Sequence, residues 1–298
     1  MSKPVILVTG ANGQLGKELQ VLAELHDDIS FVFTGREELP IQEARQVNNF
    51  FEQHRPSWCI NCAAYTAVDK AETDKETAIA VNATATGLLA AASRKNHSRF
   101  IHISTDYVFD GQSPVPYTED SPTHPINAYG ASKLKGEQLG LKENPESIII
   151  RTAWVYSSFG NNFVKTMLRL MKERPMINVV NDQIGAPTYA ADLANCIMQI
   201  ISFSRPTQNS KPETQNWIPG IYHFSNEGRI SWFDFAMAIR EMSHSSCTVN
   251  AIPSSQYPTP AKRPAFSLLD TQKIRKTFNC EIPGWKDGLE RCLQKLID

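Results

Sequence analysis

Thr9-Gly10-Ala11-Asn12-Gly13-Gln14-Leu15-Gly16 is the stretch that decides the fold, and its glycines recur as G-x-x-G-x-x-G. It follows a short apolar run, Val5–Thr9, and opens a helical pattern over Gln14–Leu25. The first glycine allows a sharp turn, the second lets an anion approach the helix N-terminus, and the third lets the helix pack closely on the sheet. This position, between the first strand and the first helix, predicts a dinucleotide-binding domain.

Apolar runs and helical patterns alternate through the first half of the chain. Further strands are predicted at Ser30–Thr34, Trp58–Ala63, Arg99–Ser104 and Ser147–Arg151, and helices at Gln42–His54, Lys75–Asn96 and Ala128–Leu141. Short apolar strands separated by helices predict right-handed crossovers and a parallel sheet with both faces covered. The expected fold class is therefore α/β, with a doubly wound, Rossmann-like parallel sheet.

The chain is expected to divide into a sheet domain and a smaller lobe. Residues 1–152 are predicted to form the dinucleotide-binding domain, to which a helix near 188–204 returns. Residues 153–298 are predicted to form a mostly C-terminal substrate-binding lobe, partly interleaved with the first domain. Within this half, helices are expected at Asn162–Glu173, Ala190–Phe203, Trp232–Met242 and Asp287–Leu296, a strand at Ile221–Phe224, and a polar surface loop at Ser204–Pro219.

Composition excludes several classes of protein. The 298 residues carry 30 basic and 31 acidic side chains, and this balance argues against a dedicated binder of nucleic acid or of membrane surfaces. No apolar run approaches the roughly 18–20 residues that span a bilayer, and the N-terminus lacks a signal-peptide pattern. We therefore expect a cytoplasmic protein whose six cysteines are reduced.

The end of the second strand bears on the choice of cofactor. An acidic residue there favours the free ribose of NAD, but this chain has Thr34-Gly35-Arg36. Arg36 can pair with a 2′-phosphate, so we expect NADPH as the cofactor, with NADH as the alternative.

Tyr129 and Lys133 are the candidate proton-transfer pair. They form a Y-x-x-x-K motif on a predicted helix, where residues four apart share a face. A neighbouring ammonium is expected to lower the pKa of the tyrosine toward working pH, so that it exchanges a proton with a carbonyl or alcohol oxygen. Ser104 and Thr105 end the fourth strand, and one of these hydroxyls should face the substrate.

These motifs resemble the extended short-chain dehydrogenases/reductases and, within them, the dTDP-4-dehydrorhamnose reductase family. The resemblance covers most of the chain, with matching stretches that include Asn61–Glu72, Ser104–Phe109, Arg151–Tyr156, Asn181–Thr188 and Tyr257–Pro264. Its most specific segments are Ala67–Glu72 and Asp182–Thr188. It implies reduction of the C4 ketone of dTDP-4-dehydro-L-rhamnose by hydride from NAD(P)H. This is the last step of dTDP-L-rhamnose synthesis, which serves cell-surface polysaccharides.

The resemblance also implies roles for individual residues. Tyr129 would donate the proton, Lys133 would tune it and hold the cofactor ribose, and Thr105 would hydrogen-bond the reacting oxygen. Cofactor contacts would come from Gly10, Gly13, Gln14, Leu15, Gly16, Ala63, Ala64, Tyr65 and Thr66. Substrate contacts would come from Asp106 and Trp154. Lys262 and Arg263 would balance the substrate pyrophosphate, the alternative being that both are solvated.

The sequence departs from the family pattern at two places, the adenine contact and the Mg²⁺ ligands. The family has an aspartate near the adenine where this chain has Pro40. Some members hold Mg²⁺ between the subunits of a homodimer with acidic side chains; Glu18 matches one of these acids, but Ala191 stands where the second is expected, beside Asp192. The Mg²⁺ site is therefore in doubt, with Glu18 as its one candidate ligand, and a homodimer is left open.

Two alternative functions share this fold. A different NAD(P)-dependent nucleotide-sugar enzyme, such as an epimerase or 4,6-dehydratase, is one. A dehydratase typically has Asp-Glu after the strand-four threonine, whereas this chain has Asp106-Tyr107. A non-catalytic regulatory subunit is the other, and retention of Thr105, Tyr129 and Lys133 argues against it.

Overall fold

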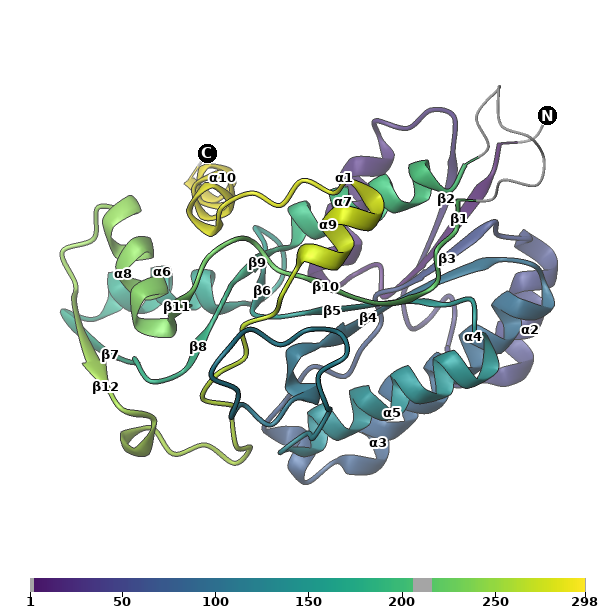
Figure 1. Ribbon diagram of the computed structural model, residues 1–298. Coiled ribbons are helices and arrows are strands. Elements are labelled where there is room, and N and C mark those ends of the chain that lie inside the picture. Colours follow the sequence, from purple (N-terminus) through teal and green to yellow (C-terminus); the bar gives the residue numbers. More distant parts are fainter. Residues whose placement is uncertain (1–2, 206–215, 298) are drawn as a thin grey trace.

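A six-stranded parallel sheet forms the centre of the computed structural model, which describes residues 3–205 and 216–297 (Figure 1). Its strands lie in the order β10-β5-β4-β3-β1-β2. Their bounds are β1 Val5–Thr9, β2 Ser30–Thr34, β3 Trp58–Asn61, β4 Arg99–Thr105, β5 Ile148–Thr152 and β10 Gly220–Phe224. The predicted α/β fold with a Rossmann-like parallel sheet is confirmed. Strand order reverses between β1 and β3, where such sheets open a crevice at the carboxyl ends of their strands.

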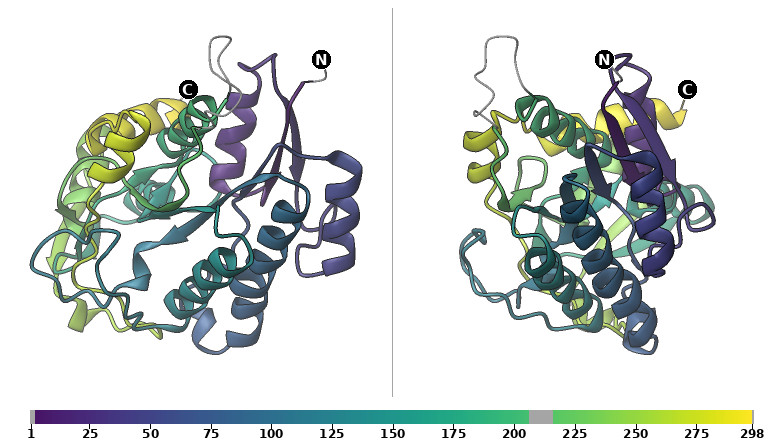
Figure 2. Two further views of the ribbon diagram at one scale, coloured as in Figure 1. Left: turned by 45° about the vertical axis from the view of Figure 1, so that its right-hand side comes forward. Right: turned by 90° about the vertical axis from the view of Figure 1, so that its right-hand side faces the viewer.

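Helices cover both faces of this sheet (Figures 1 and 2). One face carries α1 (Gln14–Ala23), α7 (Ala190–Phe203) and α9 (Gln272–Phe278), and the other carries α2 (Ala44–His54), α4 (Ala85–Lys95) and α5 (Ala128–Glu143). Because successive side chains of a strand point to opposite faces, Ile6 and Val8 join the apolar cluster under α1 and α7, whereas Leu7 joins the cluster under α2 and α4.

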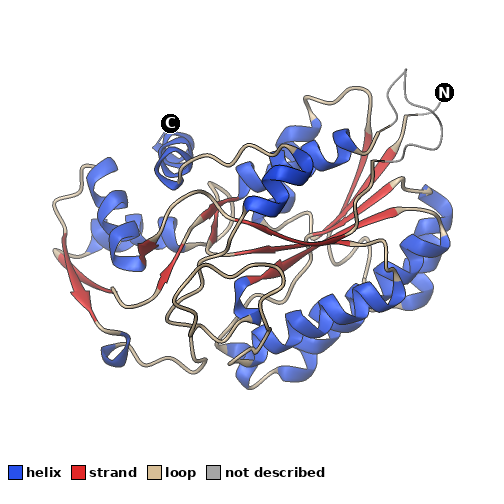
Figure 3. Cartoon of the chain, in the orientation of Figure 1, coloured by secondary structure: helices blue, strands red, loops and turns tan. Residues whose placement is uncertain are grey.

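A second group of elements packs beyond one end of the sheet around its own apolar cluster (Figure 3). It contains α6 (Phe163–Glu173), α8 (Trp232–Met242), α10 (Trp285–Ile297) and the parallel pair β7 (Met176–Val180) and β12 (Thr248–Ile252). Short pairs β6 (Val155–Tyr156) with β9 (Thr188–Tyr189), and β8 (Ile184–Gly185) with β11 (Ile230–Ser231), join this group to the sheet. The predicted strand at Ile221–Phe224 is the edge strand β10.

The helix expected over Lys75–Asn96 is interrupted. It consists of α3 (Lys75–Ile79), a π-helical turn η2 (Ala80–Thr84) and α4. Asn82 lies in the π-helical turn and is fully buried. Its Oδ1 accepts from Tyr65 N at 2.8 Å and its Nδ2 donates to Tyr65 O at 3.1 Å. Such turns often occur beside functional sites. Of the loop expected at Ser204–Pro219, residues 206–215 lie outside the described part of the chain.

Candidate active site

A cleft of about 710 Å³ opens at the carboxyl ends of the central strands. Its lining includes every residue that the sequence predicted to contact a cofactor, namely Gly10, Gly13, Gln14, Leu15, Gly16, Arg36, Ala63, Ala64, Tyr65, Thr66, Tyr129 and Lys133. These residues come from loops after β1, β2 and β3, from the first turn of α1 and from α5, so the fold brings together segments more than 100 positions apart.

The glycine turn is packed tightly between β1 and β3. Gly10 has a φ of +70°, and a Cβ there would lie 2.5 Å from Ala63 N. A Cβ on Gly16 would lie 2.5 Å from Gly10 O. Gly13 is the N-cap of α1, so the first turn of this helix faces the cleft. This helix end offers backbone N–H groups to an anion in the cleft.

The turn after β2 brings in a carboxylate that was not predicted from the sequence. Glu38 Oε2 accepts a hydrogen bond from Gly35 N at 2.8 Å, beside the predicted Arg36. Gly35 and Arg36 both line the cleft, and so does Pro40, where the family has its aspartate. The available signal was that Glu38 lies three positions after Gly35, because a turn of this length can bring a glutamate back onto the strand end.

Tyr129 lies in the first turn of α5, and that turn is fixed at two points. Asn127, the N-cap, accepts from Gly130 N at 2.7 Å through its side-chain oxygen. Gly130 packs so closely that a Cβ would lie 2.1 Å from Tyr107 O. The rings of Tyr107 and Tyr129 meet edge to face, with centroids 5.8 Å apart. These contacts hold the start of α5 against the end of β4.

The pKa of Tyr129 is raised in this structure, whereas Lys133 was expected to lower it. Burial raises the pKa of Tyr129 to about 12, and the Thr105 hydroxyl opposes this only in part. Burial also lowers the pKa of Lys133 to about 8. Lys133 Nζ is directed into the protein, 2.6 Å from Ile103 O and 3.3 Å from His102 Nε2. Desolvation therefore outweighs the predicted stabilisation of the phenolate by the ammonium.

Ser104, near the end of β4, lines the cleft. The next two residues, Thr105 and Asp106, are buried. Thr105 Oγ1 donates to Asp106 Oδ1 at 3.0 Å and accepts from Tyr107 N at 3.2 Å. Burial raises the pKa of Asp106 to about 6, against the lowering effect of the Ser267 and Thr105 hydroxyls. Thr105 thus connects Asp106 electrostatically with Tyr129.

Trp154 follows β5 in the left-handed region, with a φ of +49°. Its indole stacks on Trp232 of α8 at 3.7 Å, and Gly185 packs against it so closely that a Cβ would lie 2.9 Å from its ring. A strained backbone held by such packing is typical of functional positions. Trp154 therefore lies between the sheet and the second group of elements.

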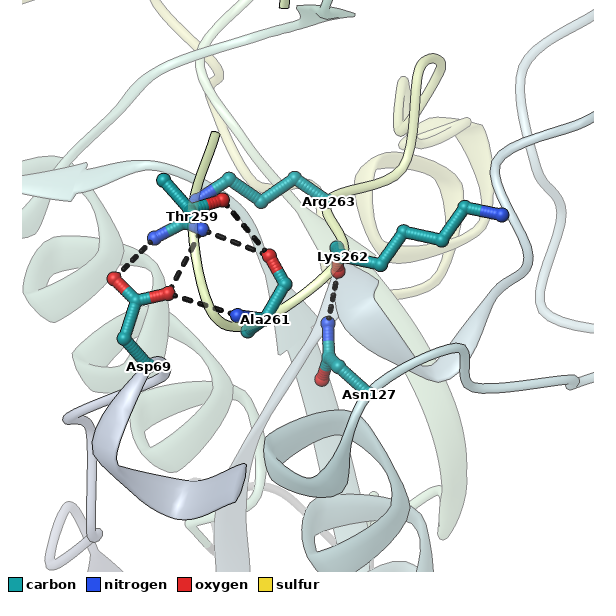
Figure 4. Close-up of polar contacts among 6 residues, drawn as sticks. All are labelled: Asp69, Asn127, Thr259, Ala261, Lys262 and Arg263. Atoms are coloured by element: carbon teal, nitrogen blue, oxygen red, sulfur yellow. Dashed lines mark hydrogen bonds and ion pairs between the residues drawn. The ribbon is translucent and has the colours of Figure 1, made fainter. Parts of the chain in front are cut away.

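Arg263 is engaged in an ion pair that the sequence analysis did not foresee (Figure 4). Its Nη2 lies 2.9 Å from Asp69 Oδ2 and its Nη1 donates to Asp69 Oδ1 at 3.0 Å. Ala261 N also donates to Asp69 Oδ1, at 3.1 Å, and Asn127 Nδ2 donates to Lys262 O at 2.9 Å. The segment carrying Arg263 is thus tied both to the loop after β3 and to the N-cap of α5. Lys262 points away from Asp69 in Figure 4 and is exposed.

Glu18 is buried on α1 and has protein partners. Ser157 Oγ donates to its Oε1 at 2.6 Å, and Lys295 Nζ lies 3.6 Å from its Oε2. Asp192 is paired with Arg291 at 2.7 Å. Across residues 3–205 and 216–297, no group of three or more His, Cys, Asp or Glu side chains could hold a metal ion. All six cysteines are free thiols.

Comparison with known proteins places this architecture in a family. The family model described as the RmlD substrate binding domain matches residues 4–297. A dTDP-4-dehydrorhamnose reductase of Aggregatibacter actinomycetemcomitans is 42% identical, over 96% of this chain and 97% of that protein. The enzyme of the same name from Escherichia coli K12 is 40% identical, over 98% of each chain.

Solved structures agree with this assignment. The dTDP-4-dehydrorhamnose reductase of Bacillus anthracis, solved in complex with NADP, has a TM-score of 0.91 and 39% identity, covering 99% of this chain and 100% of that one. A UDP-glucose 4-epimerase of Thermus thermophilus, at 19% identity and a TM-score of 0.78, shares the fold. Within the described residues, the structure has no helix with the length and apolar character needed to cross a membrane. The chain belongs to the RmlD substrate-binding-domain family, together with the dTDP-4-dehydrorhamnose reductases.

Proposed function

We propose that this protein is a dTDP-4-dehydrorhamnose reductase, which reduces the C4 ketone of dTDP-4-dehydro-L-rhamnose to dTDP-L-rhamnose with hydride from NADPH. The observation that carries the proposal is the single cleft lining that joins the glycine turn, Tyr129 and Lys133. Full-length identity to reductases of this name supports it.

Residues 1–152, with the helix near 188–204, are proposed as the dinucleotide-binding domain, and 153–298 as the substrate-binding lobe. The N-terminus of α1 would hold the pyrophosphate through Gly13, Gln14 and Leu15. Gln14 is already oriented, since its Oε1 accepts from Asn162 Nδ2 at 2.9 Å. Ala63, Ala64, Tyr65 and Thr66 would lie along the nicotinamide half, and the Lys133 amine would donate to the ribose. The bound cofactor supplies the hydride.

Tyr129 is the proposed proton donor to the C4 oxygen. A pKa of about 12 keeps its hydroxyl protonated at neutral pH, which is the state that a donor requires. As the ketone oxygen gains negative charge, its proton affinity rises and the phenolic proton is transferred. Thr105 would hydrogen-bond the same oxygen and hold it in place.

Asp106 and Trp154, which follow β4 and β5, are proposed to contact the sugar nucleotide. For the substrate pyrophosphate, the geometry favours a division of roles between neighbouring cations. The charge of Arg263 is balanced by Asp69, so it would chiefly fix the loop, while exposed Lys262 would meet the phosphates.

NADPH is proposed over NADH because Arg36 lines the cleft and because the Bacillus anthracis relative was solved with NADP. NADH is kept as the alternative, because the Glu38 carboxylate beside Arg36 could bind the free ribose of NADH. No role is proposed for Mg²⁺, since Glu18 is engaged by Ser157 and Lys295. A cytoplasmic location is proposed, as the sequence led us to expect, and a homodimer stays a prediction.

The test is an assay of the purified chain that follows NADPH oxidation with dTDP-4-dehydro-L-rhamnose and identifies the product by NMR. We expect dTDP-L-rhamnose, with slower turnover of dTDP-4-keto sugars of other configuration. Formation of a 4-epimer without net NADPH oxidation would instead support the epimerase alternative. Binding without any turnover would support the regulatory one.

A further inference from the structure

A chain of buried polar side chains leads from the glycine turn to Lys133. It consists of Thr9, Asn61, Thr86, His102 and Lys133, each at most 1% exposed. His102 lies in the middle of this chain, between Ile101 and Ile103 on β4, and the proposed reaction gives it no task. A buried imidazole in contact with a catalytic amine calls for an explanation.

The orientation of the Asn61 amide is fixed from outside the chain. Ala63 N lies 3.2 Å and Thr9 Oγ1 lies 2.8 Å from Asn61 Oδ1. A backbone N–H can only donate, so the atom that it meets must be the amide oxygen. The amide nitrogen then faces Thr86 Oγ1 at 3.4 Å. This fits as well, because the Thr86 hydroxyl donates its own proton to Asn82 O.

This orientation determines where His102 carries its proton. Asn61 Nδ2 lies 3.0 Å from His102 Nδ1, and since it is a donor, Nδ1 must accept. Burial, followed by the nearby Lys133, holds the pKa of His102 well below its usual value, so the ring is neutral. A neutral imidazole has one N–H, which therefore sits on Nε2. That nitrogen lies 3.3 Å from Lys133 Nζ.

An N–H directed at Lys133 Nζ requires a lone pair on that nitrogen. An ammonium has three donors and no acceptor, whereas a neutral amine has two donors and one acceptor. The amine can accept from His102 Nε2 while it donates to Ile103 O at 2.6 Å. We propose that His102 is a positioning residue that weakens proton binding by Lys133, because its Nε2–H favours the neutral amine over the ammonium before cofactor and substrate bind. Turning the Asn61 amide over would set its N–H groups against the N–H of Ala63.

The other groups around Lys133 do not reverse this. Glu137, one turn further on α5, and Cys62, after β3, both raise the pKa of Lys133, but burial outweighs them. Glu137 is itself bound by Arg151 of β5, 2.7 Å away. The hydrogen-bond geometry at His102 acts in the same direction as burial.

The consequence rests on the proposed function: a Lys133 that binds its proton weakly stabilises the Tyr129 phenolate less, so the tyrosine stays protonated until the ketone is bound. Both properties that test the proposal belong to the protein alone, without cofactor or substrate. The proposal can therefore fail while the reductase activity stands, and it can hold if the activity is absent.

The first measurement is the tautomer of His102, read from the ring ¹⁵N signals of protein labelled at histidine. His102→Phe, which has no ring nitrogen, assigns the signals. We expect a neutral ring protonated at Nε2 between pH 6 and 8. A neutral ring protonated at Nδ1, or a charged ring, would overturn the proposal.

The second measurement is the titration of Lys133, followed by NMR of protein with ¹³C at lysine Cε and assigned with Lys133→Met. We expect its midpoint at least one pH unit below the ordinary lysine value of about 10.4, a tenfold weaker hold on the proton. Asn61→Asp presents only acceptors to His102, so it should move the imidazole proton to Nδ1 and strengthen proton binding by Lys133 at least tenfold. An ordinary midpoint in the wild type, or an unmoved imidazole proton in Asn61→Asp, would contradict the proposal. If Asn61→Asp does not fold, the wild-type tautomer and midpoint decide.

Discussion

Replacing Glu137 by glutamine should destabilise the scaffold that carries the candidate proton donor. Glu137 lies on α5, and its carboxylate accepts from Arg151 Nε at 2.9 Å, from Arg151 Nη2 at 2.7 Å and from Ser104 Oγ. The two charged side chains are only 3% and 2% exposed. Glu137→Gln keeps the shape but leaves the guanidinium charge buried and uncompensated, at a cost of about 3–5 kcal/mol in the free energy of unfolding.

The expected melting shift follows from chain length. An unfolding entropy of roughly 2.1 cal/mol/K per residue gives about 0.6 kcal/mol/K for a chain of this size, so the midpoint should fall by about 5–8 °C. Calorimetry and urea unfolding would measure it. Glu173→Gln is the control, because it breaks the Arg169–Glu173 pair, whose side chains are 59% and 50% exposed. It should cost at most about 0.5 kcal/mol.

A further variant separates charge burial from lost packing. Replacing both partners, as in Glu137→Leu with Arg151→Met, removes the buried charges together and should recover most of the stability. If Glu137→Gln melts within about 1 °C of the wild type, or if the double variant is less stable than the single one, the buried Arg151 charge does not carry the predicted cost.

Other predictions concern the candidate site. Asp69→Asn should loosen the loop held by Arg263 and raise the KM for the dTDP-sugar about two- to fivefold, with kcat retained. The size follows because the partly exposed Asp69–Arg263 pair is worth ~0.5–1 kcal/mol. A fall in kcat at unchanged KM would contradict this. Arg36→Asp should shift the kcat/KM ratio from NADPH toward NADH by roughly tenfold or more, and an unchanged ratio would remove Arg36 from cofactor recognition. Burial raises the pKa of Asp106 from 3.8 to about 6, so its charged form destabilises the fold. Its penalty is absent below pH 4 and grows as pH rises through 6, so Asp106→Asn should gain stability relative to wild type, by up to ~3 kcal/mol, between pH 4 and 7 in urea unfolding. A difference that does not change with pH would contradict this.

The central sheet could be predicted because its strands are short, continuous apolar runs. Strands β1 and β2 have the predicted bounds, and each of β3, β4 and β5 overlaps its predicted run. The pair β7 and β12 escaped prediction, because exposed and buried residues mix along both strands and the sequence offers no long apolar run. The helix interruption at Ala80–Thr84 was hidden within an alanine-rich pattern that suits an uninterrupted helix.

Among the site residues too, those in local motifs could be predicted, whereas those paired with distant segments could not. The glycine turn, Tyr129 and Lys133 are local motifs, so spacing alone was enough to bring them to one cleft. Partners such as Asp69 for Arg263 join segments 194 positions apart, and nothing local marks them. His102 had one usable signal, a polar residue between Ile101 and Ile103 in a predicted strand. The direction of the Tyr129 pKa depends on burial, which sequence spacing does not give.

The central claim is that Tyr129 gives its proton to the C4 oxygen of the ketone. The most direct measurement compares Tyr129→Phe with the wild type in two assays, turnover of dTDP-4-dehydro-L-rhamnose with NADPH and equilibrium binding of NADPH. Loss of general acid catalysis predicts a fall in kcat of about 10²–10⁴, with the Kd for NADPH within about threefold of the wild type. Turnover within about tenfold of the wild type, with the same binding, would contradict the claim.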